Sequence, residues 1–369
     1  MRLTTISLLV AAIPAIGLAA CSGGKTAAGE AAAATPVETL RSRLLAIDSC
    51  SGVMLGHHDD PVYGYTWTGD TGRSDVLEVV GDYPAMMSWD LGAIELGRDS
   101  NLDGVPFDRI RAEVAAQDAR GGFNTFSWHL YSPVDSSDCW TIGDSLTVQR
   151  ILTDSVVHAA YERQLDRVAD FFNSLTDADG NKIAVIFRPW HEHTGTWFWW
   201  GRPYCTPDEY RELWLSTRRG LEERGVDNLL YAYSPDRVTS EEDYMERYPG
   251  DDAVDIMGID IYQFDDAAGT DTYRRAAELG LSVVCEAAAE HGKIAAFTET
   301  GLEGLRMDDW YTTVLLPLLK AHPVSYVVVW RNSQQKPGHF YAPYPGHPSA
   351  SDFKKFYDDS TTLFVNNLK

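Results

Sequence analysis

Two glutamates follow closely after apolar, β-branched runs, where charged side chains are rare. Glu192 comes after the run over residues 183–189, and Glu299 comes after the run over residues 294–298. A carboxylate at such a place costs free energy unless it faces a functional cleft or a partner charge. Hydrolysis of a glycosidic bond needs two carboxyl groups, one that protonates the leaving oxygen and one that attacks the anomeric carbon. Glu192 and Glu299 are therefore the catalytic candidates.

The two carboxyl groups must differ in protonation if they are to share this reaction. The acid has to hold its proton before the attack, which requires a raised pKa. A neighbouring carboxylate and surrounding indoles would raise the pKa of the glutamate that serves as the acid, by repulsion and desolvation. A separation of about 5–5.5 Å between the carboxyl groups would leave no room for a water and would retain the configuration of the sugar. The alternative is that both acids are structural, in ion pairs with Arg188 and Arg331.

Short apolar runs recur along the chain, each followed by a polar loop and a helical pattern. Near-continuous apolar runs are typical of strands buried on both faces, as in parallel sheets. The eight predicted strands cover residues 52–57, 84–90, 122–129, 183–189, 228–234, 254–262, 294–298 and 326–330. The main amphipathic helices are predicted over residues 107–120, 156–175, 207–224, 273–291 and 309–321.

This alternation predicts an α/β fold, a single (β/α)8 TIM barrel. The other candidate is a doubly wound open sheet, but no G-x-G-x-x-G motif follows the first predicted strand, so its nucleotide-binding form lacks support. Active sites of (β/α)8 barrels lie at the carboxyl ends of the strands. The fourth and seventh strands face each other across the barrel mouth, so this fold would bring Glu192 and Glu299 together.

The overall charge excludes some classes of partner. The 369 residues include 31 basic and 54 acidic side chains, which gives a formal net charge of −23. Nucleic-acid binding requires a basic surface that replaces phosphate counterions, and an anionic membrane surface repels an acidic protein in the same way. The chain also has 11 Trp, 18 Tyr and 13 Phe, whose flat apolar faces must lie in the core or in a cleft. We therefore expect a neutral ligand and no nucleic-acid partner.

Several motifs resemble those of glycoside hydrolase family 26, whose commonest activity is β-1,4-mannanase. The segment FRPWHEHTGTWFWWG at 187–201 is similar to the fourth-strand signature of that family, and FTETG at 297–301 is similar to its nucleophile motif. Weaker matches in the same order are TFSWH at 125–129, GIDIY at 258–262 and VVWRNS at 328–333. The resemblance covers residues 50–335. It implies a retaining β-mannanase that acts on mannan-type polysaccharides or manno-oligosaccharides, with Glu192 as general acid/base and Glu299 as nucleophile.

The resemblance also implies which side chains bind the substrate beside the scissile bond. These are His129, His191, Trp197, Tyr262, Trp330 and Arg331, with Trp140 as a looser candidate on a poorly anchored loop. The pair His193-Thr194 departs from the family pattern and puts the shape of one flanking subsite in question. Aromatic rings stack on the apolar face of a pyranose, and we expect Trp197 to do so, while Trp199 and Trp200 serve the core. Tyr262 could orient Glu299 through a hydrogen bond.

Other functions stay open on the sequence. Some members of the family cleave mixed-linkage β-glucan or β-1,3-xylan, and endo action is not separated from release of mannobiose. A metal-dependent barrel hydrolase could take ligands from His191-x-His193 or from His57-His58-Asp59, since histidine pairs bind zinc. No HExxH pattern supports that alternative, and we expect neither a metal nor another cofactor. A non-catalytic glycan-binding lipoprotein is the third possibility.

The first residues have the pattern of a secretory leader. Residues 1–20 contain Arg2, an apolar run and no acidic residue, and Leu18-Ala19-Ala20-Cys21 resembles a bacterial lipobox. We expect a signal peptide over 1–20, lipidation of Cys21, a flexible Gly/Ala-rich tether over 21–38 and a catalytic barrel over 39–369. The protein would then be an exported monomer, anchored to the membrane only through the lipid. The absence of an early acidic cluster after Cys21 slightly favours a periplasm-facing anchor over the cell surface.

Four further cysteines are Cys50, Cys139, Cys205 and Cys285. Export permits disulfides, and four cysteines allow three pairings. Cys139 and Cys205 lie in polar, aromatic loop segments and are the favoured pair. Cys285 is predicted inside a helix, where a small buried hydrophobe is the simpler interpretation.

Overall fold

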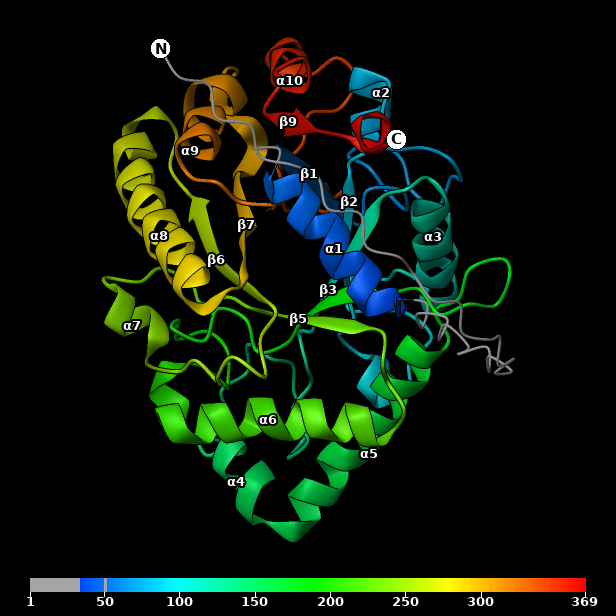
Figure 1. The fold of residues 1–369 in the computed structure, drawn as a ribbon, viewed down its shortest axis with the longest axis vertical. Helices are drawn as coiled ribbons and strands as arrows, with labels where there is room; N and C mark the ends of the chain where they lie inside the picture. The colour runs from blue at the N-terminus through cyan, green and yellow to red at the C-terminus, as the bar shows by residue number, and fades with distance from the viewer. Residues whose placement is uncertain (1–33, 50–51) are drawn as a thin grey trace, which may run out of the picture. The chain divides into compact units, whose positions relative to one another are not determined.

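Eight parallel strands close into a barrel in the computed structural model, which describes residues 34–49 and 52–369 (Figure 1). Strand β1 pairs with β2 on one side and with β8 on the other, and this pairing closes the sheet. The strands are β1 (Val53–His58), β2 (Met86–Asp90), β3 (Phe123–Ser127), β4 (Val185–Arg188), β5 (Leu229–Tyr233), β6 (Ile256–Gln263), β7 (Ile294–Leu302) and β8 (Tyr326–Val329). A two-residue strand, β9 (Thr362–Leu363), adds to β1. The predicted (β/α)8 barrel and its eight strands are confirmed.

Ten α-helices accompany the strands in the described part of the chain. They are α1 (Pro36–Ser49), α2 (Asp75–Val80), α3 (Phe107–Ala119), α4 (Thr147–Thr153), α5 (Ser155–Asn173), α6 (Pro207–Glu223), α7 (Glu241–Met245), α8 (Thr270–His291), α9 (Leu316–Ala321) and α10 (Ala350–Tyr357). The predicted helices correspond to α3, α5, α6, α8 and α9, and the last begins as a π-helical turn over Tyr311–Leu315. The shorter helices α2, α4, α7 and α10 carry too few turns to show a helical period in the sequence.

Local signals explain where the long helices begin and end. Thr206 caps α6 through a reciprocal pair of hydrogen bonds with Glu209, and Pro207 occupies the first helical turn, where its missing N–H is not needed. Gly292 ends α8 in the left-handed conformation, with φ at 63°, which a glycine adopts without a Cβ clash. The end of α8 at Gly292 directs the chain into β7.

The inside of the barrel holds its own apolar cluster. Strand residues near the amino ends, among them Met54, Ile186 and Tyr326, pack there against Leu40 and Leu44 of α1. Helix α1 therefore lies across the amino-terminal end of the barrel (Figure 1). The boundary expected after residue 38 falls within this helix. Because the amino end is covered, the carboxyl ends of the strands are left as the open end.

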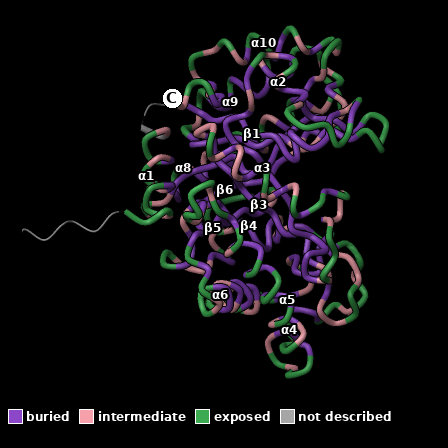
Figure 2. The backbone as a smooth tube through the Cα atoms, turned by 90° about the vertical axis from the view of Figure 1, so that its right-hand side faces the viewer, coloured by how far each residue is buried: buried purple, intermediate pink, exposed green. Residues whose placement is uncertain are grey.

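A second cluster lies between the strands and the surrounding helices. Side chains from successive strands pack outward against α3, α5, α6 and α8, with Leu165, Trp214 and Leu281 fully or almost fully buried. Every strand residue of β1 to β5 is buried. Figure 2 shows the buried strands inside and exposed segments mostly on the outer helices and loops. The two clusters together hold the strand ends at fixed positions around the barrel mouth.

The favoured disulfide between Cys139 and Cys205 is wrong. Both thiols are buried and free. The thiol of Cys205 contacts the carbonyl oxygen of Trp200 at 3.3 Å and Nη1 of Arg247 at 3.2 Å, so its surroundings are those of a packed core residue. Cys285 lies inside α8 as expected, and Cys50 lies outside the described residues.

The predicted leader, Cys21 and most of the tether also lie outside the described residues. Within residues 34–49 and 52–369, no helix has the length and apolar character that crossing a bilayer requires.

Candidate active site

An open cleft of about 480 Å³ lies at the carboxyl ends of the strands. Five of its side chains follow or end consecutive strands from β3 to β7, and others come from the loops after β3, β4, β6 and β8. The lining residues are His129, Trp140, Glu192, Trp197, Phe198, Asp236, Arg237, Tyr262, Phe264, Glu299, Trp330, His339 and Tyr341. The structure therefore brings Glu192 and Glu299 into one cleft, as the barrel fold predicts.

Glu192 lies on a strained turn after β4. Its backbone is left-handed, with φ at 53°, and so is that of Trp190, at 54°. Such conformations cost free energy in residues other than glycine and persist where neighbours fix them. The Glu192 N–H donates to the carbonyl of Ser234 at 2.8 Å, and the Trp197 indole N–H donates to Glu192 Oε2 at 2.6 Å. These bonds hold the carboxyl group over the cleft.

Two polar groups fix Glu299 inside the barrel mouth. The Tyr262 hydroxyl donates to Glu299 Oε2 at 2.7 Å, and the Arg188 guanidinium forms an ion pair with Oε1. Arg188 also pairs with Asp260 at 2.7 Å. Burial alone would lower the pKa of this guanidinium, but the carboxylates of Asp260 and Glu299 raise it. Arg188 therefore stays charged and stabilises Glu299 as a carboxylate.

Glu192 has the opposite electrostatic environment. Burial raises its pKa well above the usual value, and the nearby carboxylates of Glu299, Asp260 and Asp236 raise it further. The Trp197 N–H acts in the other direction, since it stabilises the carboxylate. One acid of the cleft thus has a raised pKa and the other is paired with a cation, which is the difference that an acid catalyst and a nucleophile need.

A chain of hydrogen bonds lies behind the cleft. Asp90 accepts from Nδ1 of His129 at 2.7 Å, and His129 Nε2 lies 3.2 Å from Nε2 of His191. Burial lowers the pKa of His129, but the charge of Asp90 and its hydrogen bond offset this, so that the pKa is raised. His191 is buried beside Arg188 and His129, and both burial and these charges lower its pKa well below the usual value. The two histidines thus have opposite pKa shifts, and His129 is the one that lines the cleft.

The aromatic side chains fall into two groups. Trp197 is 37% exposed and Trp140 is 48% exposed, and both line the cleft. Trp140 stacks on His129 with ring centroids 5.2 Å apart, so its loop is better anchored than the sequence indicates. Trp199 and Trp200 are buried, which confirms their assignment to the core. The cleft therefore offers two partly exposed indole faces beside Glu192.

Arg331 is not among the residues that line this cleft. It pairs with Asp103 at 2.8 Å and lines an adjoining pocket of about 180 Å³ with Tyr63. The structural alternative, in which Arg188 and Arg331 neutralise the two acids, therefore holds only for Arg188 and Glu299. Glu192 has no such cation.

Of the histidine sets considered as metal ligands, His191 and His193 have different partners, and in the second set only His58 and Asp59 lie close together, at 3.6 Å. The ring of His193 lies between Tyr210 and Tyr233, with centroids at 4.4 and 4.9 Å, whereas His191 bonds to His129. His57 Nδ1 pairs with Asp60 at 2.6 Å and His58 Nδ1 bonds to Ser88 at 2.9 Å.

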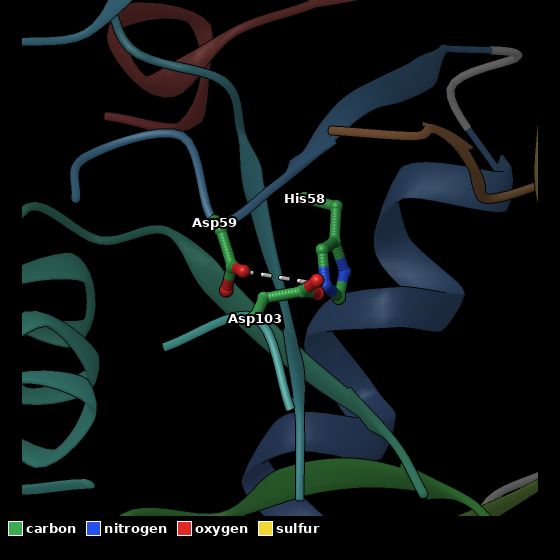
Figure 3. Close-up of side chains that lie close together, drawn as sticks. All are labelled: His58, Asp59 and Asp103. Atoms are coloured by element: carbon green, nitrogen blue, oxygen red, sulfur yellow. Dashed lines mark ion pairs between the residues drawn. The ribbon is translucent and has the colours of Figure 1, made fainter. Parts of the chain in front are cut away.

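One other group is close enough for a cation. His58, Asp59 and Asp103 offer ligand atoms within 4.8 Å of one another. Figure 3 shows the carboxylates of Asp59 and Asp103 next to the His58 ring. The guanidinium of Arg331 already pairs with Asp103 and supplies a positive charge there.

The sequence missed several lining residues. Asp236 and Arg237 lie just beyond β5, and Phe264 lies just beyond β6. His339 and Tyr341 come from the long loop after β8, more than nine residues beyond that strand. The residues after β5 and β6 could be found from their position at a strand end. No periodic pattern in the sequence indicates His339 or Tyr341.

Comparisons with known proteins agree with this geometry. Residues 35–303 match the model of glycosyl hydrolase family 26. A GH26 β-mannanase from Bacteroides ovatus has 45% sequence identity and a TM-score of 0.86, and the match covers 90% of this chain and 96% of that one. A modular endo-β-1,4-mannanase from Cellulomonas fimi has 32% identity and a TM-score of 0.80, over 91% of this chain and 77% of that one.

Curated relatives point the same way but are longer. A mannan endo-1,4-β-mannosidase from Bifidobacterium adolescentis is 31% identical over 317 residues, which are 80% of this chain and 31% of that protein. One from Bacillus subtilis is 32% identical over 220 residues, 57% of this chain and 56% of that protein. The chain thus spans about a third to just over half of the length of these two relatives.

The raised pKa of His129 predicts a pH-dependent effect of Asp90→Asn. The paired, protonated form of His129 stabilises the fold below pH 6.5, the value for a free histidine, and this stabilisation is lost as the pH rises through the folded pKa. Removal of the Asp90 charge should lower the free energy of unfolding by about 3–5 kcal/mol at pH 6, and by less at pH 9. Urea denaturation at both pH values measures this. The control is Asp135→Asn, on an exposed carboxylate of the loop after β3, which should change the free energy of unfolding little at either pH. If Asp90→Asn lowered the free energy of unfolding equally at pH 6 and pH 9, the pairing of Asp90 with a protonated His129 would be contradicted.

Proposed function

The chain belongs to glycosyl hydrolase family 26, and from that premise we propose that it is a retaining β-mannanase that hydrolyses β-1,4-mannosidic bonds. The observation that carries the proposal is the opposite environment of the two acids in one cleft. Glu299 is paired with Arg188 and bonded to Tyr262, while burial and three carboxylates keep Glu192 protonated. The substrate class is supported by the relatives, which are β-mannanases from several organisms.

The first step forms a covalent intermediate. Glu299 attacks the anomeric carbon as the bond from that carbon to the glycosidic oxygen breaks, and Glu192 gives its proton to the departing oxygen. The hydrogen bond from Tyr262 and the ion pair with Arg188 hold the attacking carboxylate in one orientation. The products are a mannosyl ester on Glu299, a free alcohol end on the leaving sugar and an ionised Glu192.

The second step returns both acids to their starting states. The ionised Glu192 takes a proton from water, and the resulting hydroxide oxygen bonds to the anomeric carbon as the ester bond to Glu299 breaks. Two inversions at one carbon give net retention. The nearby Trp197 N–H stabilises Glu192 while it is ionised, since it donates to Oε2 at 2.6 Å.

We also propose that Cys21 is lipidated and anchors the exported protein, facing the periplasm or the cell surface. The support is the sequence Leu18-Ala19-Ala20-Cys21 after an apolar leader. Expression in a Gram-negative host with an alkyne fatty acid should label the wild-type protein and place it in the membrane fraction. Cys21→Ala should lose the label and leave that fraction, and a labelled Cys21→Ala protein would contradict the proposal.

Substitution of the two acids should separate their roles. Glu299→Ala should lower kcat by at least a factor on the order of 10^4 for every substrate, as removal of a covalent nucleophile does. Glu192→Ala should lose about 10²–10⁴-fold on mannotetraose but keep most of the first step on 2,4-dinitrophenyl β-mannobioside, whose leaving group needs no proton. Added azide should then give a β-mannobiosyl azide with Glu192→Ala only. Near wild-type turnover by Glu299→Ala would refute the nucleophile assignment.

Product analysis should identify the substrate class and mode of action. We expect reducing ends from mannan and galactomannan, and little or none from lichenan and β-1,3-xylan. A ladder of manno-oligosaccharides at early times would show endo action, and mannobiose alone would show exo action. Hydrolysis of lichenan or xylan in preference to mannan would overturn the proposed substrate, and binding of mannan with no release of reducing sugar would overturn catalysis.

A further inference from the structure

We propose that Asp236 is a specificity-determining residue that binds a hydroxyl group of the leaving-group sugar, beside the exposed ring of Phe264. The inference rests on the proposed function, because it assigns one side of the same cleft. It extends that function to two residues that the catalytic steps above do not use.

Asp236 is the third carboxylate of the cleft. It follows β5, the strand next to the one that positions Glu192, and it lines the same cavity. Its carboxylate accepts a hydrogen bond from the backbone N–H of Arg237, and burial raises its pKa. The guanidinium of Arg237 donates instead to the carbonyl of Tyr262 at 3.1 Å. A half-buried carboxylate with free acceptor capacity and no described ion-pair partner is suited to accept hydrogen bonds from sugar hydroxyls.

The positions of the two catalytic acids indicate which sugar of the substrate lies next to Asp236. Glu299 must contact the anomeric carbon, so the sugar that becomes bound to the enzyme lies over Glu299. Glu192 must contact the glycosidic oxygen, so the leaving sugar extends past Glu192. Asp236 follows β5, which pairs with β4, and the carbonyl of Ser234 two residues before it accepts the N–H of Glu192 at 2.8 Å. Glu299 lies on β7, two strands further around the barrel. Asp236 therefore belongs to the leaving-group side.

Phe264 adds an exposed apolar face to the cleft, on the loop after β6 that is tied to the loop of Asp236. It is 68% exposed, which is unusual for a phenylalanine, and its ring lies 6.3 Å from that of Tyr262. Arg237, the neighbour of Asp236, is bonded to the backbone of Tyr262, so the loops after β5 and β6 are tied together. A flat ring beside an unpaired carboxylate is a typical arrangement for a pyranose, whose C–H face stacks while its hydroxyls are bonded.

The charge of Asp236 has a second effect. The charged groups that act on Glu192 are the carboxylates of Glu299, Asp260 and Asp236 and the guanidinium of Arg188. Loss of the Asp236 charge removes one repulsion, so the pKa of Glu192 falls. The enzyme would then lose its proton donor at a lower pH, and the basic limb of the pH profile would move toward lower pH.

Two substrates with the same glycone separate this role from a structural one. Mannotetraose has sugars on the leaving-group side. The aryl substrate 2,4-dinitrophenyl β-mannobioside has none there, and its leaving group departs without a proton from the enzyme. Asp236→Asn should lower kcat/KM for mannotetraose by about 10–100-fold and leave that for the aryl substrate within twofold. Phe264→Leu, which keeps the apolar volume but loses the flat face, should likewise lower kcat/KM for mannotetraose alone. Glu241→Gln, an exposed acid five residues further on, is the matched control and should change neither.

The outcomes discriminate between the two levels of the proposal. If Asp236→Asn lowered kcat/KM equally for both substrates, its role would be structural. If it lowered kcat/KM for neither, Asp236 would not contact the sugar. Either result overturns the inference. A basic limb for mannotetraose that does not move would overturn the electrostatic effect. Failure of the wild type on every mannoside would overturn the proposed function itself. Thermal melts of the variants exclude misfolding as the cause of a loss.

Discussion

The ion pair of Arg188 with Asp260 and Glu299 is the interaction on which the rest of the site depends. A buried guanidinium without its carboxylates would cost several kcal/mol, and buried carboxylates without it would take up protons. Arg188 comes from the end of β4, Asp260 from β6 and Glu299 from β7, so the pair also connects three strands across the barrel. Burial of the two apolar clusters inside and around the barrel offsets the free energy of desolvating these charges. The result is one ionised carboxylate, fixed in orientation, beside a second carboxyl group that lacks a cation.

The difference between Glu192 and Glu299 follows from this arrangement. The Arg188 guanidinium forms ion pairs with Asp260 and Glu299, whereas Glu192, on a left-handed turn, forms no ion pair with it. Its neighbours are carboxylates and an indole, so its proton is retained until a departing oxygen accepts it. The charge and hydrogen bond of Asp90 raise the pKa of His129 despite its burial, and His129 lines the same cleft. The barrel closes its amino end with α1, which leaves the carboxyl ends of the strands as the place where these groups meet.

Much of this arrangement could be predicted from the sequence, since strand ends are visible there. Apolar runs locate the eight strands within a few residues, and the residues after them include Glu192, Tyr262 and Trp330. Residues on long loops could not be predicted, because tertiary contacts rather than periodicity set the path of a loop. His339 and Tyr341 line the cleft in this way. The pairing of Cys139 with Cys205 failed for the same reason, since similar polar surroundings in the sequence do not place two thiols side by side.

The central claim is that Glu299 is the ionised nucleophile of a two-step reaction. Incubation with 2-deoxy-2-fluoro-β-mannosyl fluoride, or its mannobiosyl form, slows the second step and traps the intermediate. Mass spectrometry of the intact protein and of its peptic peptides would then locate the added sugar. The account predicts one added glycosyl group per chain, on the peptide that contains Glu299. A sugar on Glu192 or another residue, or turnover of mannan by a protein that never becomes labelled, would contradict it.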